Sequence, residues 1–149
     1  MKRSTIVEII AFLFIILFLY TGISKWLEYD VAREQIATTP ILAPMAGVII
    51  IVLPLLEILT ALLLFIPSTR RKGLTLSLAL MILFTGYVLY ILNYNKELPC
   101  TCGGILQEMS WDQHLIFNTA FTSLAALAIF LNKKPKYNKE NSNQASLAG

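Results

Sequence analysis

Residues 6–26 read IVEIIAFLFIILFLYTGISKW, an apolar run long enough to cross ~30 Å of hydrocarbon as a helix rising ~1.5 Å per residue. Three more runs of this kind lie at residues 44–66, 74–93 and 111–131. Hydrocarbon offers no partner for backbone N–H and C=O groups, so each run must satisfy them internally as a helix. The sequence therefore predicts an all-α, integral membrane four-helix bundle that forms one domain over residues 1–132.

The composition excludes a water-soluble globule. The chain of 149 residues is 56% hydrophobic and 14% charged, which is more apolar surface than a domain of this size buries. Lys2 and Arg3 precede the first run as in a secretory signal, but the run is too long and has no cleavage site, so we expect it to be retained. Residues 133–149 are polar and aperiodic, which predicts a disordered cytoplasmic tail.

The basic residues predict how the bundle is oriented. Nine of the twelve precede the first run, fill the turn after the second or follow the fourth, and only Lys25, Arg33 and Lys96 fall on the other side. The positive-inside rule then puts both termini in the cytoplasm of a bacterium, with the protein in its inner membrane. Because this distribution accounts for the net charge of +3, we predict no nucleic-acid partner.

Two opposite charges interrupt the apolar runs. Lys25 lies near the end of the first run and Glu57 lies well inside the second. A carboxylate at such a depth costs ~2.5 to 3.5 kcal/mol on insertion scales, so it should face the bundle and find a partner. An ion pair between the two is the structural interpretation; the functional one makes them the polar floor of a cavity that handles protons or a quinone head group.

Aromatic residues gather at the end of the third run. Tyr87, Tyr90 and Tyr94 follow the spacing i, i+3, i+7 and share one helix face. This pattern is typical of an aromatic belt at the membrane surface, and it also suits the wall of a pocket for a flat ligand such as a quinone. Spacing alone leaves both interpretations open.

Local signals define the start of the fourth helix and a short helix after the first. Ser110 with Gln113 forms a capping box, which predicts that the helix begins at Trp111 and that His114 and Asn118 share a face. Residues 29–37 are expected to form a surface helix at the membrane interface.

Both cysteines of the chain lie in the segment between the third and fourth runs, which the predicted orientation places on the periplasmic side. In Cys100-Thr101-Cys102 the α-carbons span about 5.5 to 7 Å, which overlaps the upper part of the disulfide range of ~4.4 to 6.8 Å. A strained bond in so small a ring adds little stability and is easily reduced, so the pair favours exchange chemistry. Gly103 and Gly104 leave a sulfur accessible to an attacking thiolate.

Other roles for these residues remain open at this stage. The pair can be a passive surface disulfide, and Cys100, Cys102 and His114 supply three metal ligands, although zinc sites usually space their cysteines by two to four residues. His114 can help deprotonate an attacking thiol or can be an interfacial residue with a satisfied hydrogen bond. We predict Cys100, Cys102 and His114 as catalytic residues and no bound metal.

Several segments together resemble the MauE branch of the DoxX-like membrane proteins. They are YTGISKW, TTPILAP, LPLLEILTALLL, CTCGG and SWDQHLIFN, and the resemblance covers about residues 5–132. It implies a four-helix membrane protein linked to periplasmic thiol redox, working beside a thioredoxin-like partner in the maturation of the disulfide-rich subunit of methylamine dehydrogenase. DoxX-like relatives are tied to thiosulfate oxidation or other redox complexes, and in the DoxD type a quinone is the electron acceptor.

The resemblance also implies roles for individual residues. It maps the cysteine pair to Cys100 and Cys102, the polar cluster of the first helix to Ser24 and Lys25, and the acid of the second helix to Glu57. One departure is the Gly-Gly pair after the second cysteine, where methylamine-type members have an aromatic residue. It argues against methylamine dehydrogenase as the protein served.

The sequence thus predicts a multi-pass protein that takes part in periplasmic thiol–disulfide exchange with a thioredoxin-like or other thiol protein. Quinone is the candidate cofactor, and its expected binding residues are Lys25, Glu57, Tyr87, Tyr90 and Asn118. The alternative is a non-enzymatic subunit that packs against a larger membrane assembly, with the cysteines as a loop disulfide.

Overall fold

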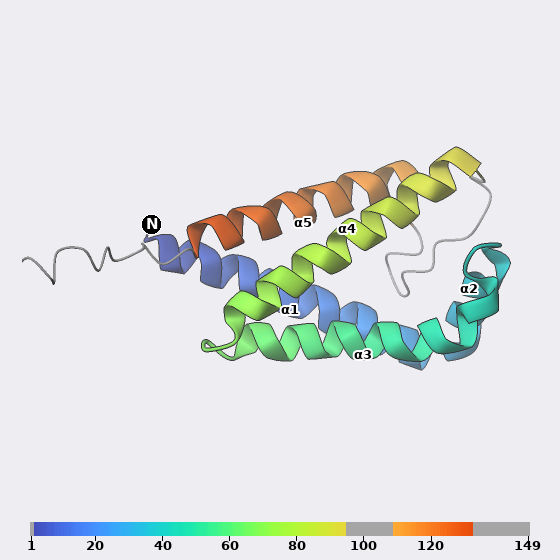
Figure 1. Cartoon of the computed structure of the whole chain (residues 1–149), viewed down its shortest axis with the longest axis horizontal. Helices are drawn as coiled ribbons and strands as arrows, with labels where there is room; N and C mark the ends of the chain where they lie inside the picture. Colours follow the sequence, from blue (N-terminus) through green and yellow to red (C-terminus); the bar gives the residue numbers. More distant parts are fainter. Residues whose placement is uncertain (1, 95–108, 133–149) are drawn as a thin grey trace, which may run out of the picture.

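The chain forms helices only, within residues 2–94 and 109–132, which the computed structural model describes (Figure 1). In chain order they are α1 (Arg3–Leu27), α2 (Tyr29–Thr38), the 3-10 helix η1 (Ala43–Met45), α3 (Ala46–Phe65), α4 (Arg70–Tyr94) and α5 (Trp111–Leu131). Four are long and apolar enough to span a membrane, namely α1, α3 with η1, α4 and α5. The predicted all-α fold with four membrane-spanning helices is confirmed.

The helix ends differ from the predicted bounds in three of the four spans. The first and third runs, expected over 6–26 and 74–93, belong to helices that extend outward to Arg3–Leu27 and Arg70–Tyr94. Hydropathy marks the part of a helix that lies in hydrocarbon, whereas the backbone bonds continue through polar residues beyond it. The second run, expected over 44–66, begins later as an α-helix because Pro44 lies in the 3-10 turn. The fourth helix has the predicted bounds of 111–131.

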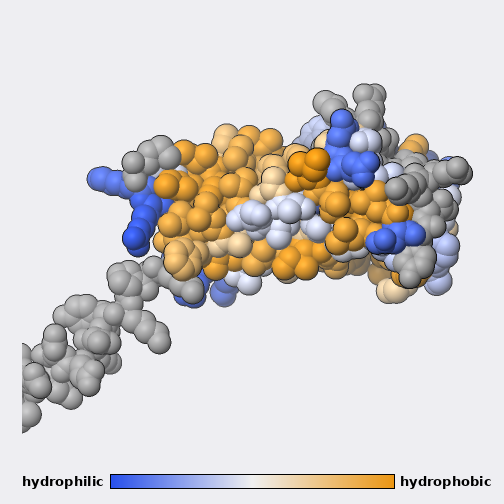
Figure 2. Space-filling view, turned by 90° about the horizontal axis from the view of Figure 1, so that it is seen from above, coloured by the Kyte–Doolittle hydropathy of each residue, from blue (hydrophilic) through white to orange (hydrophobic). Residues whose placement is uncertain are grey.

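The surface of the bundle is apolar around its middle. Large side chains near the middle of the helices, such as Ile16, Leu55 and Leu83, are 51%, 49% and 61% exposed. Figure 2 shows the hydrophobic residues as a broad band between hydrophilic ends. An apolar exterior of this extent requires a lipid bilayer as its environment.

The two ends of the bundle differ in their chemistry. The start of α1, the turn between α3 and α4 and the end of α5 lie together at one end, which we call the basic end because it carries Lys2, Arg3 and residues 70–72 (Figure 1). The other end carries α2, the end of α4 and the start of α5, and we call it the α2 end. The assignment of the basic end to the cytoplasm stays a prediction.

The interior contains two clusters of apolar side chains. The larger joins all four spanning helices and includes Phe14, Phe18, Leu64 and Met81. The smaller attaches α2, through Ala32 and Ile36, to Ala46 and Ile50 at the start of α3. The surface helix expected over 29–37 is therefore present as α2, folded against the bundle at one end.

Candidate functional site

A buried ion pair joins α1 to α3. The Lys25 ammonium lies 3.0 Å from Oε1 and 3.3 Å from Oε2 of Glu57, and the two side chains are 5% and 0% exposed. The same ammonium donates to the backbone oxygen of Thr21 at 3.4 Å. The predicted pairing of these charges is confirmed.

Gly22 allows the two helices to approach closely beside this pair. A Cβ atom at Gly22 would lie 3.3 Å from the backbone oxygen of Pro54 and 3.3 Å from a side-chain carbon of Ile58. Because glycine has no side chain there, the α1 backbone can lie against α3 one turn before Lys25. The Lys25 ammonium then reaches the Glu57 carboxylate directly, at 3.0 Å.

The start of α5 brings two polar side chains to the same interior. The capping box is present, because Gln113 N–H donates to Ser110 Oγ at 3.3 Å and Ser110 N–H donates to Gln113 Oε1 at 3.1 Å. With the helix beginning at Trp111, His114 and Asn118 lie one turn apart on the inward face and are 2% and 4% exposed. The predicted start of the helix and the shared face are both confirmed.

The amide of Asn118 is incompletely satisfied. Its Nδ2 atom is buried and has no hydrogen-bond partner within the described ranges of the chain. A buried donor left without a partner costs ~1 to 3 kcal/mol relative to a satisfied one. A polar atom in this state marks a place where a ligand or a water molecule completes the hydrogen bonding.

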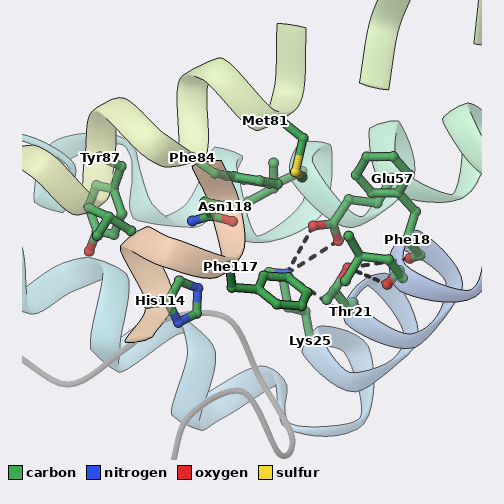
Figure 3. Close-up of a pocket in the computed structure, with 13 residues that line it drawn as sticks. Phe18, Thr21, Lys25, Glu57, Met81, Phe84, Tyr87, His114, Phe117 and Asn118 are labelled. Carbon is green, nitrogen blue, oxygen red and sulfur yellow. Dashed lines mark hydrogen bonds and ion pairs between the residues drawn. The ribbon is translucent and has the colours of Figure 1, made fainter. Parts of the chain in front are cut away.

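These groups surround one cavity of about 50 Å³ (Figure 3). Its polar lining consists of Thr21, Lys25, Glu57, His114 and Asn118, and aromatic rings complete the wall, among them Phe18, Phe84, Tyr87 and Phe117. A void needs ~10 to 15 Å³ to hold a water molecule, so this cavity has room for more than one. We call it the polar cavity.

An apolar groove of about 440 Å³ adjoins the polar cavity. It lies between α2, the segment before α3, α3 and α4, and its wall includes Ile36, Met45 and Val52. Leu53, Phe84 and Tyr87 line both spaces, so these three side chains form the partition between them. Sequence reasoning missed this groove because apolar residues within apolar helices carry no distinguishing signal.

The two tyrosines predicted to bind a ligand, Tyr87 and Tyr90, have different surroundings in the structure. Tyr87 lines both spaces, its hydroxyl group lies 3.1 Å from the Thr39 hydroxyl, and its ring centroid lies 6.5 Å from that of Trp111. Tyr90 is half-buried and is not among the residues that line either space. Its role as a ligand-binding residue stays a prediction.

The two cysteines, Cys100 and Cys102, lie outside the described residues. The segment that contains them leaves α4 at Tyr94 and reaches α5 at Trp111, and both of these helix ends belong to the α2 end of the bundle (Figure 1). His114, Tyr87 and Lys25 lie toward the same end. Five of the predicted site residues therefore meet in one cavity, namely Lys25, Glu57, Tyr87, His114 and Asn118.

The chain matches a known protein family. The family described as "Methylamine utilisation protein MauE" matches residues 3–131, which is most of the chain and includes all four spanning helices. No curated protein and no solved structure matches at a significant level. The chain is thus a multi-span membrane protein that belongs to the MauE family.

Proposed function

We propose that this protein oxidises a periplasmic dithiol protein through its Cys100–Cys102 pair and passes the electrons to a quinone in the membrane. The observation that carries the proposal is the polar cavity at the α2 end, where Asn118 Nδ2, which has no hydrogen-bond partner among the described residues, lies with His114 and a buried ion pair. The segment with both cysteines is attached at that end, and the family match extends across it.

The exchange reaction balances within the two proteins. A thiolate of the partner attacks one sulfur of the Cys100–Cys102 disulfide, forms a mixed disulfide and releases the other cysteine as a thiolate. The partner's second thiolate then displaces the first cysteine. The partner leaves with a disulfide, and Cys100 and Cys102 hold the two electrons as thiols.

The residues of the polar cavity suit the second half of the reaction. A quinone whose oxygen atom reached this cavity would accept the two electrons and two protons that are released when the two thiols become a disulfide again. Asn118 Nδ2 offers a hydrogen bond to an oxygen atom, and Lys25, Glu57 and His114 are groups that hold or move protons.

The volumes of the polar cavity and the apolar groove indicate where each part of a quinone would bind. The polar cavity of about 50 Å³ is far smaller than the ~300 to 1,000 Å³ typical of ligand pockets, whereas the adjoining apolar groove of about 440 Å³ falls in that range. The apolar body of a quinone therefore suits the groove. Its oxygen would meet Asn118 only when the partition of Leu53, Phe84 and Tyr87 moves aside.

A trapping experiment tests the exchange step. Exchange is reversible, so in a Cys102→Ser variant the Cys100 thiol attacks the oxidised partner and stays joined to it, because the cysteine that would release it is missing. We expect a reducible higher-mass band on a non-reducing gel of membranes. The matched control is Cys100→Ser combined with Cys102→Ser.

The outcomes separate the two candidate functions. An adduct with the single variant and none with the double variant supports exchange. The non-enzymatic subunit predicts no adduct in either case and normal assembly of the double variant, and that result would overturn the proposal.

A second experiment tests the link to a quinone. Purified, reduced protein mixed with a short-chain ubiquinone should lose two thiols for each quinone reduced, as followed by quinone absorbance. Asn118→Leu should slow this reaction roughly threefold to tenfold, since one hydrogen bond is worth ~0.5 to 1.5 kcal/mol. The same variant should fold at least as well as the wild type because it removes a buried donor that finds no partner in residues 2–94 and 109–132.

The control is the protein without cysteines, which should leave the quinone oxidised. Reduction at an unchanged rate in Asn118→Leu would contradict the role of the polar cavity. Such a result would leave the exchange step, which the trapping experiment tests separately, untouched.

A further inference from the structure

A second groove lies at the opposite end of the bundle, far from the polar cavity. It has a volume of about 450 Å³ and lies between α1, the end of α3 and the start of α4. Thr5, Glu8 and Arg70 form its polar part, and Phe12 and Ile15 belong to its apolar part. None of the residues that line it lines the polar cavity or the apolar groove.

The lining of the groove changes from polar to apolar along the axis of α1. Thr5 and Glu8 lie in the first turns of α1 at the basic end, and Phe12 and Ile15 follow deeper in the same helix. The rise of ~1.5 Å per residue places Ile15 about 10 Å deeper than Glu8. A phospholipid has this layout, with its head group at the surface and its acyl chain in the hydrocarbon.

The charge at the mouth of this groove is predominantly positive. The described residues of the basic end carry five cations, Lys2, Arg3, Arg70, Arg71 and Lys72, against one carboxylate, that of Glu8. Figure 2 shows hydrophilic residues gathered at this end. A head group with negative charge complements such a surface, and basic pockets between membrane helices bind anionic lipids in this way.

The Arg70 guanidinium is held at the mouth of the groove and has N–H donors available for a ligand. Its Nε atom donates to the backbone oxygen of Leu64 at 3.4 Å, and its Nη1 atom lies 3.7 Å from Glu8 Oε1. A separation of 3.7 Å exceeds the ~2.7 to 3.2 Å of a hydrogen bond, so the carboxylate holds the guanidinium loosely. The remaining N–H donors have no partner among the described residues, and they can bind a phosphate in the bidentate manner of arginine.

We propose that this groove is a binding site for an anionic phospholipid. Its phosphate contacts Arg70, its acyl chain lies along Phe12 and Ile15, and Glu8 competes with the phosphate for the guanidinium. The site is independent of the proposed thiol chemistry, since it lies at the other end of the bundle.

The test uses purified protein in mild detergent with phosphatidylglycerol or phosphatidylcholine added, and native mass spectrometry counts the retained lipids. Wild-type protein should retain phosphatidylglycerol in preference to phosphatidylcholine. Arg70→Gln should lower this retention about fivefold, the effect of one cation at a lipid surface. Glu8→Gln should raise the retention because it removes the competing carboxylate.

Opposite effects of Arg70→Gln and Glu8→Gln are the expected signature, because a general loss of folding lowers retention in both variants. Arg33→Gln is the matched control, since Arg33 is an exposed cation on α2 at the other end, and it should leave retention unchanged. Inorganic phosphate should not displace the lipid, because the acyl chain supplies part of the binding. Equal retention of both lipids, an unchanged Arg70→Gln variant or displacement by inorganic phosphate would overturn the proposal.

Discussion

Replacing Lys25 by Met is expected to destabilise the protein by ~3 to 5 kcal/mol, the largest effect of any substitution proposed for this chain. The change leaves the Glu57 carboxylate fully buried without the ammonium that lies 3.0 Å from Oε1. A buried charge without its partner keeps its full desolvation cost and loses the compensating attraction. The free energy of unfolding, measured by SDS titration of the protein in mixed micelles, gives the effect directly.

A variant that lacks both charges distinguishes the cost of an unpaired buried charge from the contribution of the ion pair to stability. Lys25→Met combined with Glu57→Leu removes both charges of the pair, and replacing a buried ion pair by apolar residues of similar size is often neutral or stabilising. We therefore expect the double variant to recover most of the stability that either single variant loses. Arg33→Met is the control, because this exposed cation on α2 should change the stability little.

The same double variant separates the two interpretations of the ion pair. If the pair only satisfies buried charge, the double variant keeps its thiol–quinone activity together with its fold. If the pair is the polar floor of the cavity, the double variant folds and loses that activity, which is the result we expect. A double variant as unstable as the single variants would contradict the physical account of the pair.

Replacing Gly73 by Ala is expected to have the second largest effect, lowering the free energy of unfolding by ~1 to 3 kcal/mol through overpacking. A Cβ atom at Gly73 would lie 2.9 Å from the backbone nitrogen of Leu64 and 3.0 Å from the backbone carbon of Leu63. Both obstacles are backbone atoms of α3, so they cannot rotate out of the way. The two helices would have to move apart next to the turn that connects them.

Gly86 provides a matched control in the same helix. A Cβ atom at Gly86 meets nothing within 4 Å, so Gly86→Ala should stabilise α4 by up to ~1 kcal/mol through helix propensity. Gly73→Ala gains the same stability from helix propensity, but it loses more because its Cβ atom collides with the α3 backbone. We expect the change in the free energy of unfolding, relative to the wild type, to be negative for Gly73→Ala and positive for Gly86→Ala. Equal changes in the two variants would show that the close approach at Gly73 carries no cost.

The amino-acid sequence by itself determined the fold class, the four spans and the start of α5 at Trp111, and it offered Lys25 as a partner for Glu57. Each of these follows from a strong local or chemical constraint. Hydrocarbon fixes the length and helical form of an apolar run, a buried charge accepts few partners, and a capping box specifies a helix start. Both α1 and α4 extend beyond their predicted bounds because polar residues can continue a helix outside the hydrocarbon.

Only the tertiary structure decided which faces of these helices meet. A helix that is apolar on all sides gives no periodic signal for its inward face, so the sequence could not tell that Phe84 and Phe117 wall the polar cavity. It could not separate Tyr87 from Tyr90, and it could not show that Asn118 Nδ2 has no partner within the described part of the chain. These features depend on how four helices pack together, and packing sets the position of every atom around a buried polar group.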